Sequence, residues 1–173
     1  RHALRSAQRA MLRPLLARAE RLVAVAQFEI GLFGKELRIP RERFVLIPNG
    51  SDLPPVARPA THTAQDGTLI ASVGRLERYK GHQRILAALP HILKQKPDVR
   101  LWIAGAGPYE AELRRLADKL GVTERVLIRA IPAAEREMMA SELSQAALFV
   151  LFSEYETHPI AALEALNLGV PAL

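Results

Sequence analysis

The sequence predicts an α/β fold for its larger part, namely a parallel sheet with helices on both faces. Short apolar runs alternate there with longer segments in which apolar residues recur at helical spacing, as at Ile85, Leu89 and Ile92. The runs are continuous in apolar residues, which is typical of strands buried on both faces of a parallel sheet. Because such sheets bind ligands at the carboxyl ends of their strands, the residues that follow each run are the candidate functional residues.

The first part of the chain predicts a strand, a helix and a second strand, at residues 21–26, 28–37 and 44–47. Pro48, Asn49 and Gly50 then predict a turn. Residues 51–66 carry several prolines and little periodicity, which is the composition of a linker. We therefore expect one domain to end at residue 49, a linker over residues 50–66, and a second domain over residues 67–173.

The second domain predicts a regular alternation of strands and helices. The expected strands are residues 68–73, 100–104, 125–129 and 148–152, and the expected helices are residues 81–96, 109–120, 134–146 and 159–168. Pro159 would stand at the first position of the last helix, where its missing N–H costs nothing. Strands that alternate with helices in this order predict a parallel sheet in which each helix connects one strand to the next.

Composition limits the class of protein. A chain of 173 residues with 49% hydrophobic content fits one full domain and part of a second. The absence of cysteine excludes disulfides and thiolate metal sites, and it fits a reducing compartment. No apolar run approaches the ~18–20 residues that cross a bilayer, and the start of the chain does not resemble a signal peptide. We predict a cytoplasmic protein.

The net charge of +6 comes from the first third of the chain: residues 1–60 hold 11 Lys and Arg against 5 Asp and Glu, and the remainder holds 13 of each. Arg1, Arg5, Arg9 and Arg13 recur at every fourth position and group on one side of a predicted helix, with an apolar stripe on another. This helix, within residues 1–21, either makes a peripheral contact with an anionic membrane or packs its stripe on a sheet. Nucleic-acid binding is disfavoured, because no aromatic residues interleave the basic run.

The loop GRLERYKG, residues 74–81, places Arg75 and Lys80 between a strand end and a helix start. A helix N-terminus attracts phosphate, and two cations at that point would neutralise a pyrophosphate leaving group. The simpler interpretation of two isolated cations is that both are solvated surface residues. Their position in this loop favours the phosphate-binding interpretation.

The segment SEYETHPIAALEALNLGVP, residues 153–171, holds two acids, Glu156 and Glu164, eight positions apart. We expect Glu156 in the loop before the last helix and Glu164 two turns inside it. The free N–H groups of the helix start lie between the two carboxylates and suit a phosphate. This spacing indicates a long polar ligand.

The turn GAGP at residues 105–108 follows a strand and opens a helix, as the dinucleotide-binding fingerprint does. In that fingerprint a third small residue keeps helix and strand close, whereas this chain has Glu110 there. We interpret the glycines as a tight turn, and a dinucleotide-dependent oxidoreductase is disfavoured.

Several motifs together resemble the carboxyl-terminal, donor-binding half of retaining glycosyltransferases with two Rossmann-like domains, the GT-B type, and family four in particular. IPNGSD at residues 47–52 is similar to the family's crossing between domains, VGRLERYKG at residues 73–81 to its cationic phosphate loop, and AGAGPYEAEL at residues 104–113 to its second βα turn. Residues 153–171 match its Glu-x7-Glu signature, followed by Gly-x-Pro. The motifs follow the family's order across nearly the whole chain.

The resemblance implies a truncated Rossmann-like donor domain, preceded at residues 1–49 by the end of the amino-terminal, acceptor-binding domain. Arg75 and Lys80 would hold the diphosphate of a nucleotide-sugar. Glu156 would favour positive charge at the anomeric carbon of the transferred sugar, and Glu164 would accept hydrogen bonds from the ribose hydroxyls.

The resemblance also implies contacts through small residues and backbone groups. Gly74 would lie beside the donor, Ile131 would border the base, and the backbone groups of Ile160 and Ala161 would border the phosphates. The donor would be a UDP- or GDP-sugar, the acceptor a glycan or lipid-linked glycan, and no metal or other cofactor would be needed.

Two features leave an alternative open. The chain has THP at residues 157–159 where the family has a glycine-containing segment, and Ala130 where glycine is common. These changes either tune the choice of donor or mark a non-catalytic nucleotide-sugar-binding domain. The acceptor half is absent from the sequence, so we expect this chain alone to transfer no sugar.

Overall fold

The computed structural model describes residues 10–56 and 67–173 of the chain. The chain divides into two compact units, Arg1–Gly50 and Ser51–Leu173. The four arginines of the predicted basic helix fall partly outside the described residues, which include only Arg13.

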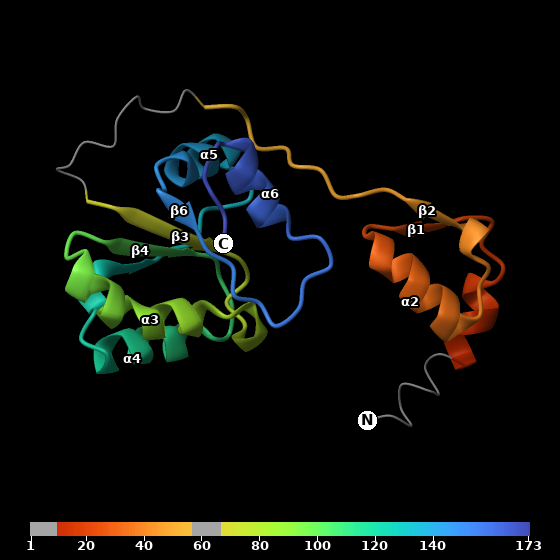
Figure 1. The fold of residues 1–173 in the computed structure, drawn as a ribbon, viewed down its shortest axis with the longest axis horizontal. Helices are drawn as coiled ribbons and strands as arrows, with labels where there is room; N and C mark the ends of the chain where they lie inside the picture. The colour runs from red at the N-terminus through yellow and green to blue at the C-terminus, as the bar shows by residue number, and fades with distance from the viewer. Residues whose placement is uncertain (1–9, 57–66) are drawn as a thin grey trace. The chain divides into compact units, whose positions relative to one another are not determined.

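The first unit is a small strand–helix–strand motif, as the sequence predicts (Figure 1). Strands β1 (Leu22–Ala24) and β2 (Phe44–Leu46) pair in parallel, and helix α2 (Gln27–Leu37) connects them, followed by the 3₁₀ turn η1 (Arg41–Arg43). Both strands are shorter than predicted, because the two backbones pair over three residues only. Helix α2 buries Ile30 and Leu37.

The described part of the basic segment is helical over residues 10–16. Met11 is 76% exposed and Leu15 is 64% exposed. Met11 and Leu15 belong to the apolar stripe of the predicted helix, and they do not pack on the two-stranded sheet of the first unit.

The second unit is a four-stranded parallel sheet in the order β5-β4-β3-β6. Its strands are β3 (Leu69–Val73), β4 (Arg100–Ala104), β5 (Val126–Ile128) and β6 (Leu148–Phe149). Its helices are α3 (His82–Gln95), α4 (Glu110–Lys119), α5 (Arg136–Ser144) and α6 (Ile160–Asn167), with the 3₁₀ turns η2 (Arg78–Lys80) and η3 (Thr123–Arg125).

Helices cover both faces of this sheet, which confirms the predicted fold class (Figure 1). Ile70 and Leu101 pack in one core with the buried residues of α3 and α4. Their neighbours Ala71 and Trp102 pack in a second core with Leu143 of α5 and other residues of α5 and α6. Alternate residues of each strand thus face opposite layers, which explains the continuous apolar runs.

Strand β6 is shorter than the predicted residues 148–152. It pairs with β3 only at Leu148 and Phe149. Beyond that point the backbone remains hydrogen-bonded, since the N–H of Val150 donates to the carbonyl of Ala71 at 2.8 Å. The apolar run therefore predicts an extended segment correctly, but only its first two residues form a regular ladder.

Candidate functional site

The strand order identifies where a ligand would bind. From β3 the chain adds β4 and then β5 on one side, and it returns to place β6 on the other side of β3. The crossovers therefore diverge between β3 and β6, and open parallel sheets bind ligands in the crevice outside such a switch point. The loops that flank it are residues 74–81, after β3, and residues 150–159, after β6.

Gly81 allows these two loops to approach closely. It has φ +79°, in the left-handed region that glycine adopts without strain, and it caps the start of α3. A Cβ at this position would overlap the carbonyl oxygen of Phe152. The N–H of Glu154 also donates to the carbonyl of Tyr79 at 2.8 Å, so backbone contacts hold the two loops together.

Lys80 and Glu156 meet between these two loops. The Nζ of Lys80 lies 2.6 Å from Oε1 of Glu156, and their side chains are 16% and 24% exposed. The hydroxyl of Ser153 donates to the same Oε1 at 2.8 Å. The structure thus brings two of the three predicted catalytic residues into direct contact, on segments that are 76 residues apart in the chain.

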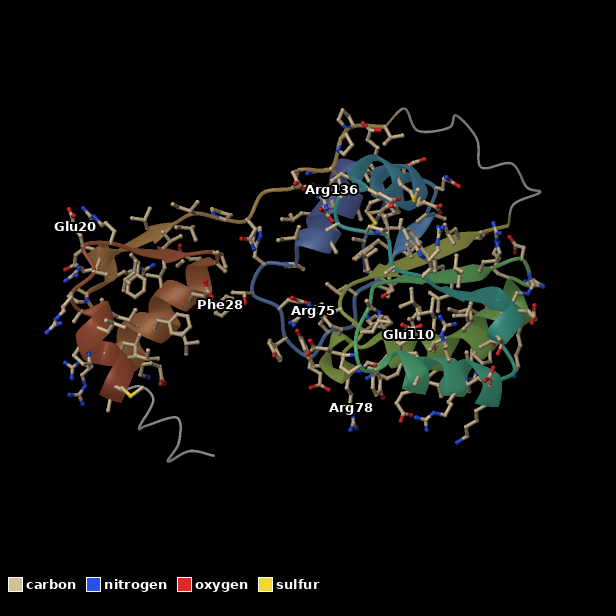
Figure 2. All side chains as sticks on the ribbon, turned by 180° about the vertical axis from the view of Figure 1, so that it is seen from behind. Glu20, Phe28, Arg75, Arg78, Glu110 and Arg136 are labelled. Atoms are coloured by element: carbon tan, nitrogen blue, oxygen red, sulfur yellow. The ribbon has the colours of Figure 1, made fainter. Side chains whose placement is uncertain are left out.

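Arg75, the third predicted catalytic residue, lies on the same loop (Figure 2), and its side chain is 69% exposed. Its Nη1 lies 2.8 Å from Glu77, and its Nη2 donates to the hydroxyl of Tyr79 at 2.6 Å. The ring of Tyr79 stacks on that of Tyr155, with centroids 4.8 Å apart, and Nζ of Lys80 lies 5.4 Å from the Tyr79 centroid. Arg75 is therefore connected to Lys80 through Tyr79.

Gly74, Arg75 and Ile131, all predicted to contact the donor, line one cavity of about 360 Å³. Gly105 lines it too. A Cβ on Gly105 would overlap the carbonyl oxygen of Gly74, so the glycine lets the turn after β4 support the loop after β3. The cavity lies at the carboxyl ends of β3 and β4 and reaches the segment that follows β5.

Glu164 lies inside α6 and is only 5% exposed. Its Oε1 accepts a hydrogen bond at 2.6 Å from Nη2 of Arg136, the first residue of α5, and this bond is the main cause that raises the pKa of Arg136. The same guanidinium forms an ion pair with Asp52. The buried carboxylate is thus compensated by a cation, as a buried charge must be.

Ile160 and Ala161 form the first turn of α6. The first N–H groups of an α-helix have no acceptor within the helix, so these two backbone groups are available to an anion. They lie in sequence between Glu156, which meets Lys80, and Glu164, which meets Arg136.

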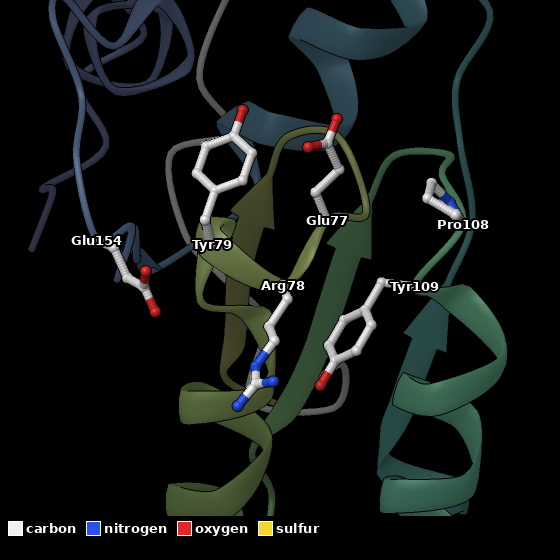
Figure 3. A pocket seen from close by; sticks show the side chains of 6 residues that line it. All are labelled: Glu77, Arg78, Tyr79, Pro108, Tyr109 and Glu154. Atoms are coloured by element: carbon white, nitrogen blue, oxygen red, sulfur yellow. The ribbon is translucent and has the colours of Figure 1, made fainter. Parts of the chain in front are cut away.

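A separate cavity of about 600 Å³ contains none of the predicted site residues. Residues of η2 and its approach, of the turn before α4, and of the loop after β6 line it, and Figure 3 shows their side chains: Glu77, Arg78, Tyr79, Pro108, Tyr109 and Glu154. Tyr79 is common to this cavity and to the contacts of Arg75 and Lys80, so the two regions are adjacent.

Three residues of the site are absent from the sequence-based prediction, namely Arg136, Asp52 and Tyr79. Arg75 comes two residues after the end of β3, and so it is found by looking at the residues that follow each predicted strand. Arg136 lies eight residues after the end of β5, too far along the chain to be found in this way. Asp52 and Arg136 are 84 residues apart, and no local spacing connects them. A cation near the start of a crossover helix is the one signal that points to Arg136.

His82 lies directly beneath the loop after β3 and predicts a pH-dependent stability. It is 1% exposed, its Nδ1 lies 2.9 Å from the hydroxyl of Ser72, and burial lowers its pKa below 6.5. The unfolded chain therefore binds a proton near pH 6.5, before the folded chain does. The stability contribution of neutral His82 is present above pH 6.5 and is lost as the pH falls toward the lower pKa of the folded state.

We expect the free energy of unfolding to be lower at pH 5.5 than at pH 7.5 when unfolding in urea is monitored by the fluorescence of Trp102. His82→Gln is expected to reduce this difference, whereas His91→Gln, an exposed position on the same helix, should leave it unchanged. An equal pH dependence in wild type and His82→Gln would contradict the assignment.

Over residues 10–56 and 67–173, no group of three or more His, Cys, Asp or Glu side chains is arranged to hold a metal ion. Within the same residues, no helix combines the length and the apolar character needed to cross a bilayer.

A family model described as glycosyl transferases group 1 matches residues 56–173. The D-inositol 3-phosphate glycosyltransferase of Segniliparus rotundus is 29% identical over 171 residues, which cover 92% of this chain and 37% of that protein. The GDP-mannose:cellobiosyl-diphosphopolyprenol alpha-mannosyltransferase of Xanthomonas oryzae pv. oryzae is 31% identical over 152 residues, which cover 87% of this chain and 38% of that protein. The chain thus spans less than two fifths of the length of these relatives.

The solved structure of Anabaena Alr3699/HepE in complex with UDP and glucose is similar to this chain with a TM-score of 0.78 and 21% identity, over 96% of this chain and 47% of that one. At this identity the likeness shows the fold alone. The family match confirms the family that the sequence motifs resemble. The chain belongs to the glycosyl transferases group 1 family, and its second unit has the Rossmann-like fold of GT-B glycosyltransferases.

Proposed function

We propose that the chain is the donor-binding part of a retaining glycosyltransferase, which transfers a sugar from a UDP- or GDP-sugar to a glycan or lipid-linked acceptor. The observation that carries this proposal is the contact of Lys80 with Glu156 at the switch point of the sheet. A cation and a carboxylate in contact suit the point where a negatively charged diphosphate is joined to a sugar.

Lys80 and Arg75 would stabilise the leaving group. In the transfer, the bond between the anomeric carbon and the diphosphate oxygen breaks, and the electron pair leaves with the diphosphate. Lys80 is largely buried, so its charge would act on the leaving oxygen with little screening by water. Arg75 is exposed on the same loop and would add a second, weaker interaction.

Glu156 would stabilise the positive charge that develops at the anomeric carbon. The acceptor hydroxyl would bond to this carbon on the face from which the diphosphate departs, and its proton would pass to the departing diphosphate oxygen, so that configuration is retained. Ser153 and Lys80 both bond to Oε1 of Glu156, which fixes the orientation of the carboxylate.

The nucleotide would contact the remaining residues of the site. Glu164 would accept hydrogen bonds from the ribose, and Gly74 and Ile131, which line one cavity, would border the donor and its base. The backbone N–H groups of Ile160 and Ala161 would donate to the phosphates. We propose no metal or other cofactor, because cations of the chain would neutralise the diphosphate.

The two units would have different roles. We propose that residues 1–49 end an acceptor-binding domain, that residues 50–66 are a linker and that residues 67–173 bind the donor. Since the chain spans 37% and 38% of two relatives, we expect it to bind donor without transferring sugar. The exposed side chains of Met11 and Leu15 support a peripheral membrane contact through residues 1–21.

A donor screen by thermal unfolding tests the proposal. Among UDP, GDP and their sugar derivatives, we expect at least one to raise the Tm, because a ligand at 100 times its Kd stabilises the folded state by about 2.7 kcal/mol. NAD serves as the comparator and should give no shift. A shift with NAD alone would contradict the proposal. Donor binding without transfer by the longer protein would support the non-catalytic alternative.

A further inference from the structure

The cavity around η2 has no role in the function proposed above. Its volume of about 600 Å³ lies in the range of ~300–1,000 Å³ that is typical of small-molecule sites. Its lining comes from three segments, namely η2 with its approach, the turn before α4 and the loop after β6 (Figure 3). The N–H of Tyr109 donates to the carbonyl of Leu76 at 2.9 Å, and the N–H of Glu154 donates to that of Tyr79 at 2.8 Å. Backbone bonds therefore hold the three segments together and preform the cavity.

Two half-buried tyrosines form the apolar part of the lining. The ring of Tyr109 packs against the core that lies between the sheet and helices α3 and α4. The ring of Tyr79 stacks on Tyr155, and its hydroxyl accepts a hydrogen bond from Arg75 at 2.6 Å. Both rings are thus held by their neighbours and still line the cavity. Because they are fixed in advance, little side-chain entropy is lost when a ligand packs on them.

The polar part of the lining is held by residues that lie outside it. Glu77 pairs with Arg75 at 2.8 Å. Glu154 pairs with Arg84 at 3.2 Å. A carboxylate has about four acceptor sites, so each acid keeps acceptors for a ligand, and Arg78 supplies donors. The lining holds two acids and one arginine, a net charge of −1, and so it suits an uncharged ligand with several hydroxyl groups better than it suits a diphosphate.

We propose that this cavity binds one sugar unit of a glycan, at a position separate from that of the donor sugar. A pyranose has apolar C–H groups on its faces and hydroxyl groups at its edge, which match tyrosine rings and carboxylates in one lining. The Nζ of Lys80 lies 5.4 Å from the centroid of the Tyr79 ring, so the bound unit would lie next to the diphosphate. A glycan at that place is the acceptor, and this identification rests on the proposed function.

The first test is a titration of the 173-residue chain with uncharged methyl glycosides, monitored by the NMR signals of the glycoside. The probes are both anomers of the methyl glycosides of glucose, galactose, mannose and N-acetylglucosamine, and no nucleotide is present. We expect at least one probe to bind with a Kd of about 1–10 mM, as is usual for one small polar ligand in an open cavity. Weaker binding by every probe would overturn the inference.

Two variants locate the bound sugar. Tyr109→Leu keeps an apolar side chain against the core but removes the ring, so it should raise the Kd by about fivefold or more. Glu154→Gln removes the charge of a lining acid and should raise the Kd by about threefold or more. The matched controls are Tyr155→Leu and Glu110→Gln, at exposed side chains outside the lining. Each control should change the Kd by less than about twofold.

A second test separates an acceptor sugar from the sugar of the donor. The glycoside titration is repeated with the chain saturated by the UDP- or GDP-sugar that raises its Tm. We expect the Kd of the glycoside to stay within about twofold, because ligands at two distinct positions bind together unless the sites are coupled. Displacement of the glycoside by the nucleotide-sugar, but not by the free nucleotide, would place it at the donor sugar and overturn the inference.

The outcomes also distinguish this inference from the proposed function. A wild-type Kd in folded Tyr109→Leu overturns the inference, as does a loss confined to Tyr155→Leu. If Tyr109→Leu does not fold, Glu154→Gln decides, since that side chain is 53% exposed. If nucleotides bind and no glycoside does, the inference fails alone. If a glycoside binds and no nucleotide does, the proposed function fails, and the cavity remains a sugar-binding site without the acceptor role.

Discussion

Glu164→Gln is expected to weaken the binding of the preferred nucleoside diphosphate by about 10- to 100-fold. A hydrogen bond to a charged group contributes about 1.5–3 kcal/mol, and 1.4 kcal/mol corresponds to a tenfold change in Kd. Glutamine preserves the shape of the side chain but removes its charge. Arg136 would still be paired with Asp52, so we expect the fold to persist with a stability loss of about 1–3 kcal/mol.

Calorimetry with nucleoside mono- and diphosphates checks this result. Because Glu164 is assigned to the ribose, both ligands should lose affinity by a similar factor. Glu112→Gln, which removes a charge from an exposed ion pair on α4, is the matched control. A folded Glu164→Gln variant with the wild-type Kd for both ligands would be incompatible with a ribose contact.

Lys80→Met is expected to weaken diphosphate binding by about 10- to 100-fold, with a smaller effect on a nucleoside monophosphate. Methionine preserves most of the length of the side chain and would remove the proposed charge-assisted hydrogen bond to the leaving phosphate. Glu156 would lose its cation but keep the hydrogen bond from Ser153. The ratio of the two affinities therefore reports where the charge acts.

Lys94→Met provides the control, since Lys94 is exposed in the last turn of α3. It should change neither affinity by more than about twofold, because exposed charges are screened by water and salt. Equal losses for mono- and diphosphate in Lys80→Met would argue that Lys80 contributes general positive charge and not a contact with the second phosphate.

Much of the second unit is predictable from the sequence because its signals are local. Continuous apolar runs predict β3 and β4 with their correct carboxyl ends, and so they locate Gly74 and Gly105. The meeting of Lys80 and Glu156 follows from two strand ends that the sheet brings side by side. The family resemblance supplies the role of each residue, and those roles remain proposals.

The remaining features depend on contacts between distant parts of the chain. The ion pairs of Arg136 join the start of α5 to α6 and to the segment after residue 50. The stack of Tyr79 on Tyr155 likewise joins two loops. The end of β6 depends on how far its backbone pairs with β3, which an apolar run does not specify. No periodicity encodes such contacts, since each depends on the finished packing.

We propose that the Lys80–Glu156 pair and Glu164 bind opposite ends of one nucleotide-sugar. The decisive experiment is a crystal structure of the chain with its preferred nucleoside diphosphate. We expect the second phosphate within hydrogen-bond distance of Nζ of Lys80 and the ribose hydroxyls against the carboxylate of Glu164. A nucleotide bound instead between Tyr79 and Tyr109, away from both Lys80 and Glu164, would contradict it.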